Sequence, residues 1–167
     1  MNFDGIVWNC AALNSTGPSS SKSLFFEKTF GTNFDVAFFV ETHHKDFNEI
    51  PTELRRYQNT HHIVHSTAPE NEPFSGIIGL VSQSYKIVGT EHLLQGRILN
   101  VKIEHSTSGE KYNLTAVYLY TNNKLTKPKT INIVDKLKQI TDQNCKNMIF
   151  GDFNFIDHPK DKINGLN

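Results

Sequence analysis

The sequence contains only two cysteines, Cys10 and Cys145, and no CxxC spacing. A disulfide framework is therefore excluded, and both residues are expected to be thiols in or near the core. An apolar run of membrane-spanning length and a basic-then-apolar N-terminus are also absent. We therefore expect no membrane segment and no signal peptide, and an intracellular protein of the nucleus or cytoplasm. The glycosylation sequons at Asn14 and Asn113 are then chance matches.

An excess of charge of either sign is absent as well, because Lys plus Arg and Asp plus Glu both number 17. No global field attracts nucleic acid or a membrane surface. Residues 1–101 hold 7 basic and 10 acidic side chains and residues 102–167 hold 10 and 7, which weakly favours a basic surface late in the chain. With 167 residues, of which 37% are hydrophobic, the chain is long enough for a single domain with a substantial core.

Short apolar runs between turn-forming residues predict a protein that mixes strands and helices. Strands are expected near residues 5–8, 35–40, 63–65, 76–82, 97–103, 112–118 and 148–150. The turn at 106–110 makes the two strands that flank it an antiparallel pair. Helices are expected at 22–30 and 127–141, and a short helix or turn at 47–57.

Polar residues stand where four of these apolar strands end. They are Asn9, Glu41, Tyr118, and Asp152 with Asn154. Strand ends are rigid, so they can hold side chains with the accuracy that metal and phosphate chemistry requires. Oxygen ligands that include a carboxylate suit Mg²⁺ or Mn²⁺ better than zinc, and the natural substrate of such a site is a phosphate ester. The alternative is a set of residues that cap neighbouring turns, with an Asx-rich turn after residue 150.

Three other features favour structural interpretations. The adjacent pairs His43-His44 and His61-His62 complete no zinc spacing, so surface or loop histidines are the better interpretation. Ser75-Gly76 lacks a GxSxG elbow, which argues against a serine hydrolase. The lysines between residues 124 and 138 are typical of a solvated helix face rather than of a DNA contact.

The order of motifs resembles the endonuclease/exonuclease/phosphatase superfamily. The matching segments are Trp8-Asn9, Glu41-Thr42, Ser75-Gly76 with Gly79-Leu80, Gly96-Arg97, Val117-Tyr118 and Gly151-Asp152-Phe153-Asn154. The segment 152–167, with its Asp-His-Pro and Asp-Lys run, is similar to the AP-endonuclease-like domains of non-LTR retrotransposons. The resemblance covers nearly the whole chain.

This resemblance implies a role for each strand-end residue. Glu41 would be the principal ligand of Mg²⁺ (or Mn²⁺), and Asn9 would assist it. Asp152 would orient the attacking water or a metal, Asn154 would bind the scissile phosphate, and Tyr118 would contact that phosphate or the water. The implied function is metal-dependent cleavage of phosphodiester bonds in DNA that leaves a 3′-hydroxyl. The alternatives are an inactive fragment that acts only in binding or association, and a hydrolase of the same superfamily that acts on RNA, inositol phosphates or sphingomyelin.

Several departures from the family pattern bear on activity. The chain has Tyr118-Leu119-Tyr120 where the family usually has Tyr-x-Pro, and Ala12 where a glycine often follows Trp-Asn. The family's late Ser-Asp-His motif, which supplies the catalytic histidine, is absent. His158 does not replace that histidine, because it lies only a few residues after a strand. The expected fold is therefore the α/β four-layer sandwich of the superfamily, truncated to its first sheet and flanking helices, with residues 1–167 as one incomplete domain.

A physical expectation follows from the two most apolar strands. Residues 36–40 and 148–150 do not alternate with polar residues, so their sheet requires cover on both faces. The helices expected at 22–30 and 127–141 can cover only one face. We therefore expect an open apolar face, self-association and negligible DNA nicking by this polypeptide.

Overall fold

The computed structural model describes residues 3–11, 13, 28, 31, 33–46, 48, 50, 52–120 and 127–154. The helix expected at 22–30, Ala12, His158 and the rest of the segment after residue 154 lie outside the described residues, apart from Lys28. The strands are β1 (Gly5–Asn9), β2 (Val36–Val40), β3 (His61–Ser66), β4 (Ile77–Ser82), β5 (Tyr85–Leu94), β6 (Ile98–His105), β7 (Lys111–Tyr118) and β8 (Lys146–Asp152). The helices are the 3₁₀-helix η1 (Thr52–Asn59) and the α-helix α2 (Lys127–Gln139).

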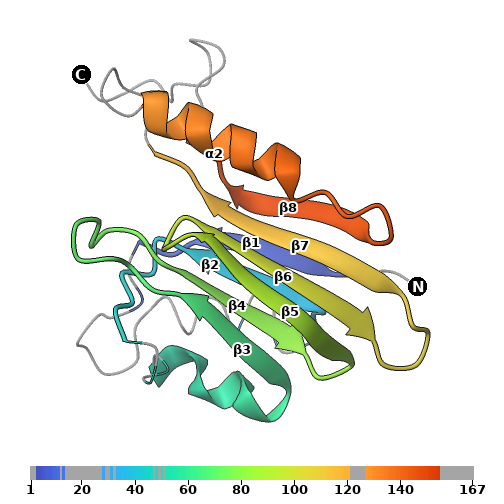
Figure 1. The fold of residues 1–167 in the computed structure, drawn as a ribbon. Coiled ribbons are helices and arrows are strands. Elements are labelled where there is room, and N and C mark those ends of the chain that lie inside the picture. Colours follow the sequence, from blue (N-terminus) through green and yellow to red (C-terminus); the bar gives the residue numbers. More distant parts are fainter. Residues whose placement is uncertain are drawn as a thin grey trace.

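The strands form two four-stranded mixed sheets. The first sheet has the order β1-β2-β4-β3, with β1 parallel to β2 and the other pairs antiparallel. The second has the order β5-β6-β7-β8, with β7 parallel to β8 and the expected antiparallel pairing of β6 with β7. In Figure 1, α2 lies beside β7 and β8, while η1 lies next to β3.

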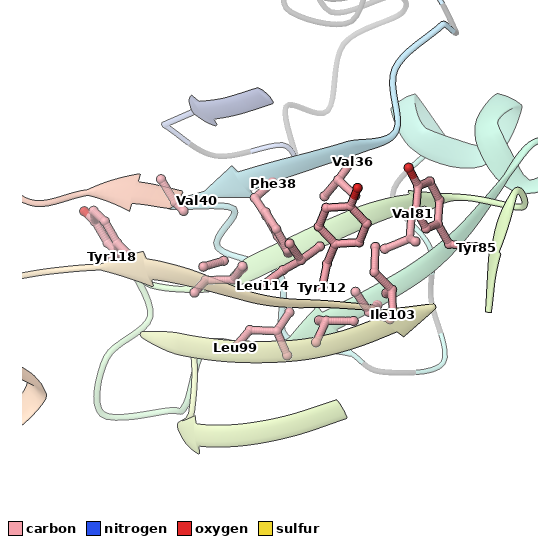
Figure 2. Close-up of a cluster of buried hydrophobic side chains, with 14 residues drawn as sticks. Val36, Phe38, Val40, Val81, Tyr85, Leu99, Ile103, Tyr112, Leu114 and Tyr118 are labelled. Carbon is pink, nitrogen blue, oxygen red and sulfur yellow. The ribbon is translucent and has the colours of Figure 1, made fainter. Parts of the chain in front are cut away.

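The main core lies between the two sheets (Figure 2). From the first sheet, β2 contributes Val36, Phe38 and Val40 to this core. From the second, β6 and β7 contribute Leu99, Val101, Ile103, Tyr112, Leu114, Ala116 and Tyr118. Every residue of β2 is buried. Burial of aliphatic and aromatic side chains stabilises a fold by about 1.5–3 kcal/mol for each, before the loss of conformational entropy is counted, so this core is the principal reason that the sheets stay together.

Two smaller clusters cover the outer faces of the sheets. Leu54 and Tyr57 of η1 pack with Ala37 and Phe39 on the outer face of the first sheet. Ile133 of α2 packs against β6 and β7 on the outer face of the second. The layers are therefore η1, first sheet, second sheet and α2, as in an α/β sandwich. No helix among the described residues combines the length and the apolarity that crossing a membrane requires.

The expected fold class is confirmed, but the expected truncation to one sheet was too narrow. The chain contributes four strands to each of two sheets. One strand of the second sheet, β5, was not predicted, because Gly89 and its polar neighbours interrupt the apolar pattern at an edge with two register shifts. The strand expected at 63–65 is confirmed and is longer and more regular than predicted, since β3 pairs with β4 over six residues.

The expectation of an open apolar face was wrong for β2, because the second sheet covers one of its faces and η1 with its neighbours covers the other. Exposed apolar residues occur instead on the side of the sandwich formed by β1 and β8. Val7 is paired with Phe38 of the core and is nevertheless 41% exposed, and Ile149 of β8 is 51% exposed. Both strands are edge strands of their sheets among the described residues.

Candidate functional site

Three polar strand-end side chains meet where the two sheets adjoin. Asn9 is the last residue of β1, Glu41 follows β2 and Asp152 is the last residue of β8. The Nδ2 atom of Asn9 donates to Oε2 of Glu41 at 2.9 Å and to Oδ2 of Asp152 at 2.7 Å. The structure thus brings these residues, which we call the strand-end cluster, within hydrogen-bonding distance across both sheets.

The amide of Asn9 has a fixed orientation. Its Oδ1 atom accepts a hydrogen bond from the backbone N–H of Ala11 at 3.1 Å, so its nitrogen faces the two carboxylates. In this orientation Asn9 supports Glu41 and Asp152 rather than offering an oxygen to an ion. Two carboxylates that share one neutral donor repel each other, and a cation would relieve this repulsion.

Tyr118 ends β7 beside the strand-end cluster. Burial, followed by a hydrogen bond to Glu41 and the charge of that carboxylate, raises the pKa of Tyr118 to about 12. The charge of Arg97 acts in the opposite direction, and the charge of Asp152 adds to the increase. The phenol is therefore protonated at neutral pH and is a hydrogen-bond donor at the site.

Asn154 lies just after the end of β8. Its backbone N–H donates to Oδ1 of Asp152 at 3.0 Å, which forms an Asx turn, and its Nδ2 donates to the carbonyl oxygen of Leu119 at 2.8 Å. One carboxylate oxygen of Asp152 therefore forms the Asx turn, and the other contacts Asn9 in the strand-end cluster. Two residues apart on an extended segment, Asp152 and Asn154 would point to the same side, but the segment is not extended at Asn154, which has a φ of +48°.

Unusual backbone conformations gather at the same place. Among the described residues, the non-glycine residues with positive φ are Ala11, Glu41, His43 and Asn154. All four lie within two residues of a member of the strand-end cluster or belong to it. Left-handed conformations of such residues cost about 1 kcal/mol or more and are concentrated at functional sites, because there they aim side chains.

His43 is a neighbour of the site that the sequence analysis missed. Its Nε2 atom lies 3.7 Å from Oε1 of Glu41. In the sequence, the position of His43 two residues after Glu41, the predicted metal ligand, could have indicated that it lies near the site. The expectation of surface or loop histidines was also wrong for His61, which is 3% exposed and belongs to β3, whereas His44 lies in the loop after β2 and is buried there. Burial lowers the pKa of His61.

A second polar group, which we call the Glu72 cluster, lies beneath Tyr118. Its members are Glu72, Arg97, Tyr120 and Lys129. Nε of Arg97 donates to Oε2 of Glu72 at 3.0 Å, and the guanidinium lies 4.6 Å from the ring centre of Tyr118 and 4.2 Å from that of Tyr120. The Tyr120 hydroxyl and Nζ of Lys129 donate to Oε1 of Glu72 at 2.6 and 3.2 Å. Partial burial opposes ionisation of Glu72, but these three donors outweigh it and lower the pKa of Glu72.

The Glu72 cluster modifies the prediction of a solvated lysine face on α2. Lys138 is 72% exposed and pairs only with nearby Asp135 among the described residues, as that prediction expects. Lys129, in contrast, reaches Glu72 and lies 4.9 Å from the ring centre of Tyr120. One lysine of this helix therefore ties α2 to the loop before β4.

Two glycines allow the close approach of segments that carry the site. A Cβ atom on Gly151 would collide with the carbonyl oxygen of Val117, so β8 comes unusually close to β7 just before Asp152. Gly76 has a φ of +110°, and a Cβ there would collide with Oγ1 of Thr42, the residue after Glu41. Both glycines therefore allow close packing around the site and contribute no ligand or catalytic group themselves.

The donor set fits a hard divalent cation. The described residues contain no group of three or more His, Cys, Asp and Glu side chains that could hold a metal. Mg²⁺, however, needs only one or two carboxylates, because it retains several waters. Glu41 and Asp152 provide two carboxylates at one amide, which meets this requirement.

Solved structures show what fold this is. D. rerio TDP2 complexed with a single-strand DNA product superposes with a TM-score of 0.68 at 16% identity over 93% of this chain. The human nocturnin catalytic domain with bound sulfate gives 0.64 at 17% identity over 89%. An endonuclease/exonuclease/phosphatase family protein from Bacteroides thetaiotaomicron gives 0.63 at 11% identity over 95%. The chain therefore has the endonuclease/exonuclease/phosphatase-type fold.

The matches cover a smaller share of the solved structures than of this chain. The chain spans 62% of the D. rerio TDP2 chain, 64% of the nocturnin chain and 65% of the bacterial chain. No protein-family model matches the sequence, and no curated protein matches it.

Proposed function

We propose that this chain is a Mg²⁺- or Mn²⁺-dependent phosphodiester hydrolase that acts on DNA, of the AP-endonuclease-like type found in non-LTR retrotransposons. The observation that carries the proposal is the convergence of Asn9, Glu41 and Asp152 at the ends of strands from both sheets. The fold supports it, because the matching structures include proteins of this superfamily.

Each strand-end residue would have a separate role in the reaction. Glu41 would hold the ion with Asp152 nearby, and Asn9 would keep the two carboxylates in place. When bound, the ion would neutralise charge that develops on the phosphate oxygens. Tyr118 would turn its phenolic hydrogen from Glu41 to a phosphate oxygen when substrate binds, and Asn154 would donate an amide hydrogen there.

In this reaction Asp152 would orient a water molecule for in-line attack on phosphorus. A new bond forms between the water oxygen and phosphorus, and the bond from phosphorus to O3′ breaks. The attacking water loses a proton, the departing O3′ takes up a proton and becomes a 3′-hydroxyl, and the phosphate stays attached to the 5′ carbon of the downstream nucleotide. Carboxylate-oriented attack at a site with preorganised donors is the general strategy of such hydrolases.

DNA is favoured as the substrate by two observations. The D. rerio TDP2 structure contains a single-strand DNA product, and the segment 152–167 resembles the retrotransposon domains. A phosphatase or RNA-directed hydrolase of the same superfamily is the second candidate. We place the protein in the nucleus or cytoplasm and treat residues 1–167 as part of one domain.

Turnover by this polypeptide alone is expected to be low. Loss of a general base costs on the order of 10²–10⁴ in rate, and the Ser-Asp-His motif is absent from the sequence. We also propose self-association through the β1–β8 side, where Val7 and Ile149 are exposed. Sedimentation velocity of Ile149→Lys should show less association than the wild type. The matched control is Val88→Lys, which changes an exposed residue of the bulged edge strand β5.

The test of the proposed function combines metal binding with nicking. The full chain should bind Mn²⁺, with Glu41→Gln weakening binding, and should nick supercoiled plasmid or an abasic-site oligonucleotide negligibly in Mg²⁺. Any residual nicking should disappear with EDTA and in Asp152→Ala. Equal Mn²⁺ binding by Glu41→Gln would contradict the proposed site. Rapid nicking lost in Asp152→Ala would contradict the expected impairment, and release of phosphate from small phosphate esters without nicking would favour the second candidate.

A further inference from the structure

His43 carries a buried ring nitrogen that has no hydrogen-bond partner among the described residues. Its Nε2 atom is shielded from solvent and receives or donates no hydrogen bond within that part of the chain. The nearby charged atom is Oε1 of Glu41, at 3.7 Å. That separation is too long for a hydrogen bond, so the contact does not satisfy the nitrogen. Buried polar atoms without partners are rare in folded proteins, and one at a candidate site points to a group that would fill the gap.

The backbone holds His43 and Glu41 in a defined arrangement. Both have left-handed conformations, with φ of +56° and +58°. The N–H of His43 donates to the carbonyl oxygen of Ser75 at 2.8 Å, and the N–H of Thr42 between them donates to that of Gly76 at 3.2 Å. The segment is therefore fixed to the loop before β4. Histidine adopts this conformation infrequently, so its use here indicates that the direction of the ring matters.

The remaining contacts of the ring do not use its Nε2 atom. The ring of Phe74 meets the ring of His43 edge to face, with centres 5.3 Å apart. That contact packs the imidazole and limits its rotation. It leaves the nitrogen facing the carboxylate side of the site. A hydrophobic role for His43 would account for the packing but not for the position of the nitrogen.

We infer that Nε2 of His43 and Oε1 of Glu41 bind the same divalent ion. Metal–nitrogen and metal–oxygen bonds are about 2.0–2.2 Å long, so two ligands of one ion lie about 3–4 Å apart. The separation of 3.7 Å fits this geometry. The inference rests on the proposed function, because it places the ion at the same Glu41, and it adds a nitrogen ligand to that site.

A nitrogen ligand changes which ion the site prefers. Mg²⁺ is bound almost entirely by oxygen, whereas imidazole favours first-row transition ions in the order of the Irving–Williams series. The structure thus assigns the site to Mn²⁺ or a later first-row ion in preference to Mg²⁺. In His43→Ala the site would contain only oxygen ligands, so this preference should be lost while weak Mg²⁺ binding remains.

The experiment measures the two ions separately on the full chain. Mn²⁺ binding is followed by electron paramagnetic resonance, and Mg²⁺ binding by competition. We expect His43→Ala to weaken Mn²⁺ binding by about tenfold and to leave Mg²⁺ binding within about twofold. The matched control is His62→Ala, which removes an exposed histidine of β3 and should change neither affinity.

A measurement on the wild type keeps the inference testable if His43→Ala folds poorly. Zn²⁺ should shift the ¹⁵N resonance of His43 Nε2, assigned with His43→Gln, and the shift should be absent in Glu41→Gln. Unchanged Mn²⁺ affinity in His43→Ala, or no Zn²⁺-dependent shift, would overturn the inference. If Glu41→Gln still weakened Mn²⁺ binding in that case, the proposed function would stand. If neither variant affected Mn²⁺, the proposed site itself would fail.

Discussion

The strand-end cluster and the Glu72 cluster are both polar groups at the junction of the two sheets, but they differ in charge balance. The strand-end cluster has two carboxylates joined by one neutral amide. The Glu72 cluster has one carboxylate that receives hydrogen bonds from an arginine, a lysine and a tyrosine. Tyr118 lies between them, since it contacts Glu41 on one side and the guanidinium of Arg97 on the other.

This difference indicates that the Glu72 cluster stabilises the fold, whereas the strand-end cluster is suited to bind a ligand. In the Glu72 cluster two cations share one carboxylate, so the folded protein satisfies the negative charge internally. In the strand-end cluster the hydrogen bonds that the two carboxylates receive from the described residues come from neutral groups, and the backbone around them adopts strained conformations. Strain and unbalanced charge persist where the surrounding structure supports them and a ligand benefits from them. Four predictions test this division, from the largest expected effect to the smallest.

Arg97→Met should destabilise the protein most. The side chains of Arg97 and Glu72 are only 10% and 16% exposed, so the substitution leaves a largely buried carboxylate with fewer donors. Removing one partner of a buried ion pair costs about 3–5 kcal/mol, and we expect about 3 kcal/mol in the free energy of unfolding measured with urea. Lys138→Met is the control, because its 72% exposed pair should contribute within about 0.5 kcal/mol. A loss below about 1 kcal/mol in Arg97→Met would show that the cluster is not structural.

Glu41→Gln should weaken Mn²⁺ binding by at least about tenfold, equivalent to about 1.4 kcal/mol. The reason is that Glu41 contacts both Asn9 and His43. Calorimetric titration of the folded chain measures the change. Glu104→Gln is a suitable control, because that partly exposed carboxylate pairs with Lys111 on the second sheet and lies at the other end of β6 from the strand-end cluster. Equal losses in both variants would indicate a general charge effect rather than a site.

Asp152→Asn should stabilise the protein when no divalent ion is present. The substitution removes one of two carboxylates that share the amide of Asn9, while the new amide oxygen can still accept the hydrogen bond from Asn9 and only the one from the N–H of Asn154 is lost. Relief of the repulsion should raise the free energy of unfolding by about 0.5–1 kcal/mol, as measured with urea in EDTA. Addition of Mn²⁺ should reverse the order of the two proteins. Destabilisation in EDTA would mean that this carboxylate is needed for folding and that the clusters do not differ as described.

The pH dependence of the Glu72 cluster should give the smallest effect. The pKa of Glu72 is lowered from 4.5 in the folded state, so its stabilising contribution is complete above pH 4.5 and is lost as the pH falls through the folded pKa. Unfolding of the wild type should therefore become easier with acid between about pH 5 and 3. Glu72→Gln should be less stable at neutral pH and should depend less on pH in that range. Parallel pH profiles for the two proteins would contradict this assignment.

The sequence was sufficient to identify the strand-end residues, because they follow apolar runs and match an ordered set of motifs. It was insufficient for β5, whose polar edge residues hide the strand, and for the Glu72 cluster, whose members are distant in sequence. Glu72 stands in a loop that turn-forming residues predict correctly, but its partner Arg97 is 25 residues away and Lys129 is 57 residues away. The role of His43 depended on a left-handed backbone, which ordinary residue preferences do not predict.

The hydrogen bond between Asn9 and Asp152 joins residues 143 positions apart. A contact of this length cannot form while the chain is short, so the strand-end cluster is completed only after β8 has been made. At about 5–20 residues per second, a ribosome takes roughly 7–30 s to add that stretch. During this time Glu41 and Asn9 can already be neighbours on β1 and β2, but Asp152 is missing. The nascent protein therefore acquires its full set of carboxylates late in synthesis.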